Sequence, residues 1–244
     1  ILPSAIPVNF TDGQVIFEVS RAEDTLGNTI LPSTDGDIGP DNAWEFIIDK
    51  TGPAASNPDP VDMSILGNTT NIVKVKITDY WSALNSGTFN LKVNNGTTNF
   101  NVSSSAFDPV TGIASFDLGA GGVTLASGRN DFVIDAAEDV HGNNLINPLY
   151  FTYFIDDQGP VVQNPYPYDG SDLQKRQTAL SMYLSDALST IDSSSIKMSI
   201  SNGTYSASLT YPSTGLYYSA GSLLYNPVDA GVLFNEGTVT VTLH

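Results

Sequence analysis

Residues 22–28 read A-E-D-T-L-G-N, and residues 137–143 repeat this stretch as A-E-D-V-H-G-N. In both places the stretch follows a glycine and an alternating apolar run, which begins at Gly13 in the first copy and at Gly128 in the second. Such alternation predicts a strand with one buried face. The Asp, Gly and Asn that come next favour a tight turn. The stretch therefore predicts a strand that ends in a turn, used twice.

A second landmark, I-D-x-x-G-P, follows each copy, at residues 48–53 and 155–160. The A-E-D copies begin 115 residues apart, whereas the I-D copies begin 107 residues apart. The difference falls in a longer first loop, residues 31–42. Homologous domains commonly differ in loop length between fixed elements. A period near a hundred residues predicts an array of whole domains rather than a solenoid of short repeats.

The second landmark divides the chain into residues 1–50, 51–157 and 158–244. Only the middle piece is a full period, and about seven short strands between turn residues predict an antiparallel sandwich there. We expect residues 1–50 to be the C-terminal part of a like domain. We expect residues 158–244 to lack the last strands, because they end in the run that elsewhere precedes A-E-D. The chain is then a segment of a longer array.

Composition excludes several function classes. The 244 residues include 26 acidic and 9 basic side chains, which gives a net charge of −17. A chain without clustered Lys and Arg is a poor ligand for nucleic acid or for an anionic membrane surface. The absence of cysteine excludes disulfides and thiolate zinc sites. No run reaches the roughly 18 apolar residues of a membrane span, so we expect no membrane insertion.

With these motifs in hand, the chain resembles the tandem bacterial immunoglobulin-like (Big-type) domains of surface and adhesin proteins. The resemblance rests on I-D-x-x-G-P at each domain start, on the segment Ser185 to Ile196, and on G-x-V-x-F-x-V before A-E-D. It implies an all-β fold of tandem immunoglobulin-like antiparallel sandwiches, one complete and two partial. It also implies an extracellular place on a bacterial cell surface.

The function that the resemblance implies is that of a spacer stalk. The partners would be neighbouring like domains of the same or an adjacent chain, with a cell-surface or glycan ligand bound through other domains. Some members of this family bind calcium between domains, and calcium takes six to eight oxygen ligands, largely from carboxylates and carbonyls.

Acidic residues that lie at predicted junctions and turns are the candidate calcium ligands. They are Asp49, Asp156 and Asp157 at the junctions, Asp79 and Asp186 in matching loops, and Asp24 and Asp139 in the repeated turns, with Glu23 and Glu138 beside them. The alternative is that the turn aspartates bond the local backbone while the junction acids are simply solvated. No EF-hand loop or calcium nonapeptide repeat is present in the sequence.

Catalysis is not expected. One of the two histidines, His141, stands where the other copy of the turn has Leu26, and no G-x-S-x-G nucleophile elbow occurs. We therefore expect no enzyme activity and no cofactor other than calcium.

Two other functions compete with the spacer. Aromatic residues suggest a carbohydrate-binding adhesin module, because aromatic faces stack on the apolar surfaces of ligands; packing in cores is the alternative role for them. They are Tyr166, Tyr168, Tyr211, Tyr217, Tyr218 and Tyr225, with Tyr80 and Trp81 in the middle piece. The partial domains at the two ends suggest a filament or surface-layer subunit, in which the N-terminal segment completes a neighbour by strand addition.

Overall fold

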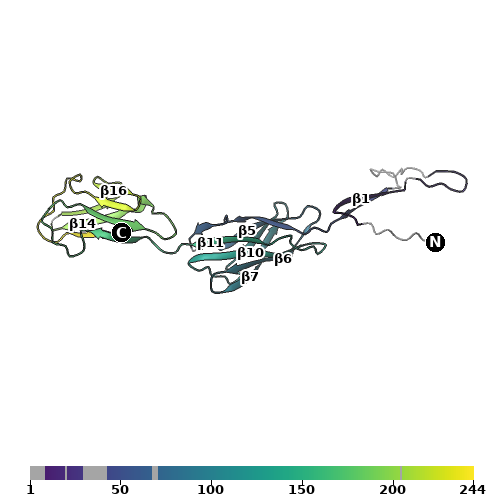
Figure 1. Cartoon of the computed structure of the whole chain (residues 1–244), viewed down its shortest axis with the longest axis horizontal. Coiled ribbons are helices and arrows are strands. Elements are labelled where there is room, and N and C mark those ends of the chain that lie inside the picture. Colours follow the sequence, from purple (N-terminus) through teal and green to yellow (C-terminus); the bar gives the residue numbers. More distant parts are fainter. Residues whose placement is uncertain (1–8, 20, 30–42, 68–70, 204) are drawn as a thin grey trace. The chain divides into compact units, whose positions relative to one another are not determined.

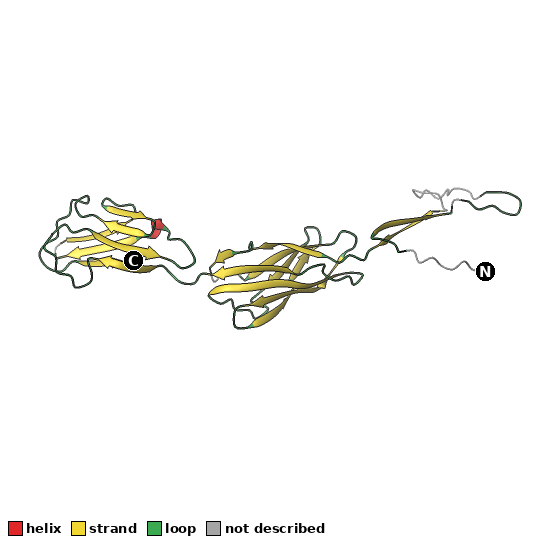
Figure 2. Ribbon diagram, viewed as in Figure 1, coloured by secondary structure: helices red, strands yellow, loops and turns green. Residues whose placement is uncertain are grey.

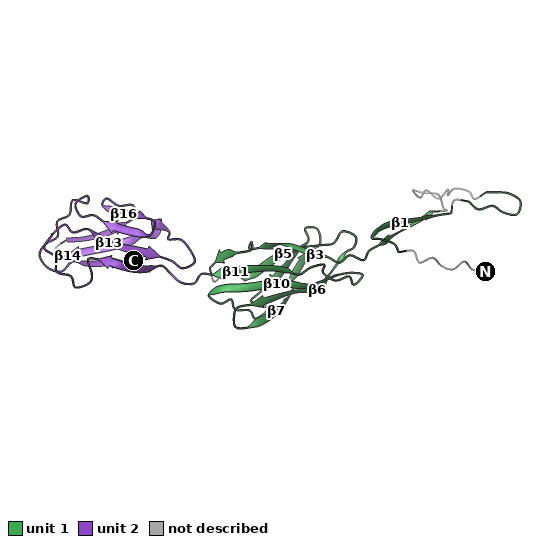
Figure 3. Cartoon of the chain, viewed as in Figure 1, with its two compact units in different colours: residues 1–155 green, residues 156–244 purple. Residues whose placement is uncertain are grey.

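The computed structural model describes residues 9–19, 21–29, 43–67, 71–203 and 205–244. The predicted loop at residues 31–42 lies outside these ranges. The chain forms two compact units, residues 1–155 and residues 156–244, which are coloured separately in Figure 3.

Strands make up the regular structure of both units (Figure 2). Among the described residues the one helical element is the 3-10 turn η1, Ser193–Ser195. The Asp192 carboxylate caps it by accepting a hydrogen bond from the Ser194 backbone N–H at 2.9 Å. The predicted all-β class with antiparallel sheets is confirmed.

The first unit begins with a hairpin of β1 (Gly13–Glu18) and β2 (Ala43–Ile48) (Figure 1). Its register pairs Gly13 with Ile48 and Phe17 with Trp44. The last two strands of the same unit, β10 (Gly128–Asp139) and β11 (Leu149–Ile155), pair Gly128 with Ile155 in the equivalent way. The hairpin thus repeats the register of β10 and β11, as the repeated sequence predicts.

Two sheets follow the hairpin and form a sandwich. One has the order β3-β5-β9-β8 and the other the order β4-β11-β10-β6-β7. Their strands are β3 (Ala54–Asp59), β4 (Ser64–Leu66), β5 (Ile72–Thr78), β6 (Leu84–Asn94), β7 (Asn99–Ser103), β8 (Ala106–Asp108), β9 (Ile113–Asp117), β10 (Gly128–Asp139) and β11 (Leu149–Ile155). All pairings are antiparallel except that between β4 and β11, which is parallel.

The sandwich core is formed by alternate residues of both sheets. Val75 of β5 and Phe116 of β9 come from one sheet, while Leu91 of β6, Phe132 of β10 and Tyr153 of β11 come from the other. These side chains are at most 1% exposed. Alternation in strands such as β5 therefore places one face in the core and the other in solvent.

The second unit has two sheets, with the orders β12-β13-β17-β16 and β15-β14-β18. Its strands are β12 (Val161–Tyr166), β13 (Leu180–Ser185), β14 (Lys197–Asn202), β15 (Tyr205–Thr210), β16 (Leu216–Ser219), β17 (Ser222–Tyr225) and β18 (Thr240–Leu243). Strand β18 pairs with β14 as β10 pairs with β6. Its core includes Met198, Ile200, Leu223 and Tyr225.

Residues 216–225 form two strands rather than one, because the chain reverses between β16 and β17. Ala220 and Gly221 have positive φ angles of 46° and 86° and form the turn between β16 and β17. A Cβ on Gly221 would lie 2.5 Å from the Tyr183 ring. Both this close contact and the positive φ angle therefore require glycine at this position.

Candidate functional site

The two landmarks of the repeat meet in space within the first unit. Gly52 of I-D-x-x-G-P lies against the chain that leaves the second A-E-D turn, so that a Cβ on Gly52 would be 1.7 Å from the Asn144 carbonyl oxygen. Next to it, the Ile146 backbone N–H donates to the Pro53 carbonyl at 3.0 Å. Both Gly52 and Pro53 are buried. The linker glycine is therefore required by the close approach of two backbones.

The A-E-D-x-x-G-N turn has the same construction in both copies. Asp139 Oδ1 accepts from the backbone N–H groups of His141 and Asn143, each at 2.8 Å, and Asp139 Oδ2 accepts from Asn143 Nδ2 at 2.7 Å. In the first copy Asp24 makes the matching bonds to Leu26 and Asn28 at 2.6 to 2.9 Å. Both aspartates therefore close their turns by accepting local hydrogen bonds, which is the role that the sequence offered as the alternative to calcium binding.

The second copy differs from the first because it is buried and has further acids beside it. Asp49, Asp79 and Asp139 each offer a carboxylate oxygen, and these oxygens lie within 4.8 Å of one another. Asp139 is 1% exposed, and the other two are half-buried. Among the described residues no Lys or Arg forms an ion pair with any of the three. We call this group the junction cluster.

Strand topology explains why residues so distant in sequence converge. Strand β5 ends at Thr78, which pairs with Ala54 at the start of β3, so Asp79 lies beside the entering linker that carries Asp49. Strand β10 ends at Asp139, which pairs with Leu84 at the start of β6. The short loop from Asp79 to Leu84 therefore runs from beside the linker that carries Asp49 to beside the end of β10 that carries Asp139.

Hydrogen bonds fix two of the three carboxylates. Asp79 Oδ1 accepts from the backbone N–H groups of Trp81 and Ser82 at 2.9 and 3.0 Å, and the Ser82 hydroxyl donates to Asp139 Oδ2 at 2.9 Å. Burial would raise the pKa of Asp139, but the bonds from Asn143, Ser82 and His141 outweigh it and hold the pKa well below its ordinary value. Asp139 is therefore ionised at neutral pH.

Asp49 supplies the observation that bears on a metal. Its Oδ1 accepts a bond from the Thr51 backbone N–H at 3.2 Å, whereas its Oδ2 is buried and has no hydrogen-bond partner. A buried carboxylate oxygen without a donor is costly. A divalent cation would satisfy it and would offset the repulsion among three carboxylates. All-oxygen donors of this kind suit calcium, so the cluster fits the cation that the resemblance implies.

The other predicted ligands do not join this cluster. Asp24 lies in its exposed turn, and Asp186 accepts from the backbone N–H groups of Leu188 and Ser189 in a loop that matches the loop of Asp79. Asp156 accepts a long bond from the Gln158 backbone N–H at 3.4 Å, and Asp157 accepts from Gln158 Nε2. Among the described residues the junction cluster is the one group of three potential metal ligands.

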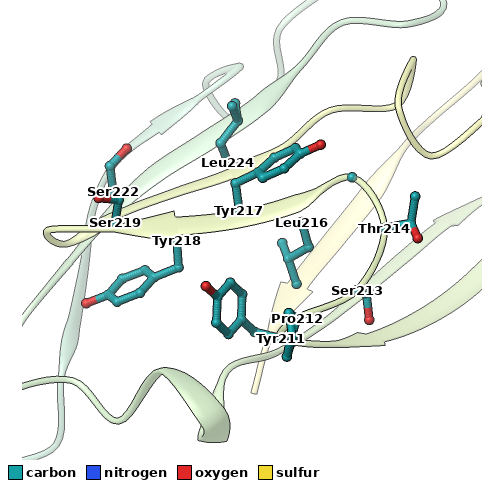
Figure 4. A pocket seen from close by; sticks show the side chains of 11 residues that line it. Tyr211, Pro212, Ser213, Thr214, Leu216, Tyr217, Tyr218, Ser219, Ser222 and Leu224 are labelled. Atoms are coloured by element: carbon teal, nitrogen blue, oxygen red, sulfur yellow. The ribbon is translucent and has the colours of Figure 1, made fainter.

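A groove in the second unit gathers three of the tyrosines singled out in the sequence. It has a volume of about 630 Å³ and lies around strand β16 and the loop before it. Tyr211 and Tyr218 lie below the strand in Figure 4, with ring centroids 6.3 Å apart, while Tyr217 lies on the other side of it. Its other lining residues are Pro212, Ser213, Thr214, Gly215, Leu216, Ser219, Ser222 and Leu224, none of them charged.

The remaining aromatics are divided between core and surface. Tyr225 is 1% exposed and packs in the core of the second unit, as the alternative interpretation expects. Tyr166 and Tyr168 form an exposed edge-to-face pair away from the groove residues, with centroids 6.5 Å apart. Tyr80 is exposed and contacts Trp81 edge to face. Tyr211, Tyr217 and Tyr218 line the groove of the second unit, and Tyr80 and Trp81 line a smaller pocket beside Gly52 and Asp79.

No protein-family model matches the chain, and no curated protein matches it. Among solved structures, CopC from Methylosinus trichosporium OB3b is similar with a TM-score of 0.33 and 9% identity, over 43% of this chain and 93% of that one. Surface layer protein SbsC, domains 1–6, is similar with a TM-score of 0.30 and 13% identity, over 79% of this chain and 23% of that one. TM-scores this low indicate nothing about function.

Within the described residues, no helical segment has the length and hydrophobicity that a membrane span requires.

Proposed function

We propose that this chain is a load-bearing spacer segment of an extracellular bacterial surface protein, built from successive immunoglobulin-like modules. The observation that carries the proposal is the shared register of β1–β2 and β10–β11, which repeats one structural unit along the chain. The strand orders β3-β5-β9-β8 and β11-β10-β6 also support it, because they correspond to the A-B-E-D and G-F-C orders of immunoglobulin domains.

The exposed apolar face of the hairpin gives further support. Phe17, Trp44 and Phe46 are 41 to 59% exposed, whereas their counterparts Phe132, Phe151 and Tyr153 are at most 3% exposed in the sandwich core. Phe17 and Phe46 already stack on one another, with centroids 5.6 Å apart. A face of this composition belongs against a second sheet. The hairpin would have such a sheet if it formed the last two strands of a preceding module.

A calcium ion at the junction cluster is part of the proposal. It would be held by Asp49, Asp79 and Asp139, and it would neutralise their charge without taking part in any reaction. Asp49 belongs to the linker, while Asp79 and Asp139 belong to the sandwich, so the ion would fasten one to the other. A spacer gains reach and resistance to bending when its linkers are fixed in this way.

Thermal unfolding in calcium and in chelator tests the proposed site. Both tryptophans, Trp44 and Trp81, lie in the first unit, so tryptophan fluorescence reports on that unit alone. We expect calcium to raise the melting temperature of the wild-type first unit, because a ligand that binds only the folded state stabilises it. Asp79→Asn should abolish the shift. Asp186→Asn, in the matching loop without a cluster, should keep it, and an unshifted wild type would refute the site.

Strand addition between copies is less well supported than the spacer. In the second unit β18 already occupies the place that β10 has beside β6, so one further strand would complete that sheet. The hairpin of a second copy offers two strands, β1 and β2. Because β1 corresponds to β10, whose place β18 already occupies, β1 would duplicate β18. Sedimentation separates the two functions: a monomer over a wide concentration range supports the spacer, and head-to-tail oligomers support strand addition.

A second candidate function is glycan binding by the groove of the second unit. It is favoured by three tyrosines beside strand β16, two on one side of it and one on the other, together with serine and threonine hydroxyls, in a groove lined by no charged residue on a chain of net charge −17. Neutral sugars bind through such stacking and hydroxyl contacts. The Tyr217 hydroxyl donates to Asp229 Oδ2 at 3.0 Å, which fixes its ring and raises the pKa of Tyr217.

A glycan array tests this function. Binding of a neutral glycan that is lost in Tyr217→Ala and retained in Tyr168→Ala, an exposed tyrosine outside the groove, would support it. The absence of any wild-type binding, or equal losses in both variants, would remove it.

A further inference from the structure

The loop between β5 and β6 carries two aromatic residues that do not belong to the sandwich core. Tyr80 and Trp81 lie edge to face, with ring centroids 4.6 Å apart and ring planes at 81° to one another. Tyr80 is 85% exposed, whereas Trp81 is half-buried and lies against the hairpin, since a Cβ on Gly13 would be 3.8 Å from its indole. Two rings at nearly a right angle form two walls of a corner.

A small pocket is lined by both rings. Its volume is about 230 Å³, and its lining also includes Asp79 and, from the linker, Thr51 and Gly52. Pockets that enclose drug-sized molecules measure roughly 300 to 1,000 Å³. This pocket therefore suits one small chemical group rather than an extended ligand. We call the group of Tyr80, Trp81 and Asp79 the aromatic corner.

The one charged residue in the lining of this pocket is an acid. Asp79 Oδ1 accepts from the backbone N–H groups of Trp81 and Ser82 at 2.9 and 3.0 Å, which fixes the carboxylate beside the rings. Lys50, the neighbour of Thr51 in the sequence, donates instead from its Nζ to the Phe10 carbonyl at 2.6 Å. No ion pair within the described part of the chain includes Asp79. The pocket therefore attracts a cation.

The matching loop of the second unit shows what this loop needs in order to fold. Asp186 accepts from two backbone N–H groups there, in the same pattern as Asp79. Ala187 and Leu188 stand where the first unit has its two aromatic residues. The loop thus forms without aromatic side chains, so its own folding does not explain the aromatic corner.

We propose that the aromatic corner binds a trimethylammonium group such as that of choline. Cations of this kind lie against aromatic faces, and tryptophan is the ring that attracts them most strongly. A metal ion would find no oxygen ligands on the two rings, and a lysine ammonium is more strongly hydrated and needs hydrogen-bond acceptors. Asp79 would balance the charge of the bound group without donating or accepting a hydrogen bond. This site is independent of the spacer function.

Saturation-transfer NMR on the full chain tests the aromatic corner with choline as the probe, in chelator so that no calcium competes for Asp79. We expect transfer to the choline N-methyl protons with a roughly millimolar Kd, as a small ligand in an open site allows. Tyr80→Ala and Trp81→Leu install the residues that the second unit has at these positions. Each should weaken binding about fivefold or more.

Tyr150→Ala is the matched control. Tyr150 is 73% exposed in the same unit, but it lies on β11 and does not line the pocket, so this variant should bind choline as the wild type does. The uncharged analogue of choline, in which carbon replaces the nitrogen, has the same shape and should bind at least about fivefold more weakly. Because Tyr80 is exposed, Tyr80→Ala keeps the test decisive even where Trp81→Leu loses stability in urea.

The site is overturned if the wild type shows no transfer to choline, if Tyr150→Ala loses as much binding as Tyr80→Ala, or if the uncharged analogue binds as tightly as choline. Phosphocholine separates two sources of the trimethylammonium group. Its phosphate adds negative charge near Asp79, so free choline should bind more tightly. Tighter binding of phosphocholine would also support the site and would assign its ligand to a headgroup on a lipid or glycan.

Discussion

Gly52 and Asn144, 92 positions apart in the sequence, approach so closely that a Cβ on Gly52 would meet the Asn144 carbonyl oxygen at 1.7 Å. The contact joins the two landmarks by which the repeat is identified. It gives the glycine of I-D-x-x-G-P a structural reason, since that linker glycine packs against the chain that follows the A-E-D turn of its own sandwich.

Gly52→Ala should therefore destabilise the first unit by about 2 kcal/mol or more, as overpacking against backbone does. Gly159 is the equivalent residue of the second landmark, and nothing lies within 4 Å of the Cβ it would gain. Gly159→Ala should change stability by less than about 0.5 kcal/mol. Urea unfolding followed by tryptophan fluorescence for the first unit, and by circular dichroism for the whole chain, measures both. Equal effects of the two substitutions would show that the close approach does not matter.

Asp139→Ala should cost about 2 to 4 kcal/mol in the first unit, because it removes a buried carboxylate that accepts part-buried hydrogen bonds from His141, Asn143 and Ser82. Asp24→Ala removes the equivalent bonds from an exposed turn of the hairpin, where water replaces them. The urea midpoint of the sandwich should fall sharply in the first variant and little in the second. If the urea midpoint of Asp139→Ala fell as little as that of Asp24→Ala, burial of this turn would not contribute to the stability of the sandwich.

Strands with clear alternation were predictable from the sequence. The alternating runs that begin at Gly13 and Gly128 are strands β1 and β10 as expected, and the A-E-D turns were predicted as turns, because side-chain chemistry decides both locally. Strand β3 was not predicted, since A-A-S-N-P-D has no apolar alternation and is held by backbone pairing with β5. Strands β4 and β8, with three residues each, are too short to leave a pattern.

The junction cluster was only partly predictable. Its three members were among the seven candidate aspartates, but nothing local distinguishes Asp49 from Asp156, or Asp79 from Asp186. The selection comes from topology, because the ends of β5 and β10 lie beside the linker before β3. The unpartnered Oδ2 of Asp49 is a property of the folded chain alone.

Asp135 should make the first unit lose stability in acid. Burial would raise its pKa, but the Lys92 ammonium 2.5 Å away and the Asn90 amide outweigh this effect and lower it. A carboxyl with a depressed folded pKa contributes stability that is present above its unfolded pKa, about 3.9, and that is lost as pH falls through the folded value. Wild type should exceed Asp135→Asn in urea midpoint at pH 7, and the gap should shrink at pH 2.5. A gap that does not vary with pH would contradict this.

The central claim is that a cation fixes the linker where the two landmarks meet. The distance between two spin labels on either side of this junction measures it most directly. The chain has no cysteine, so Ile16→Cys in β1 and Val110→Cys in the β8–β9 turn, both well exposed, would place the labels cleanly. We expect a narrow distance distribution in calcium and a broad one in chelator. With Asp79→Asn added, the distribution should be broad in both conditions. A wild-type distribution whose width is the same with and without calcium would contradict the account.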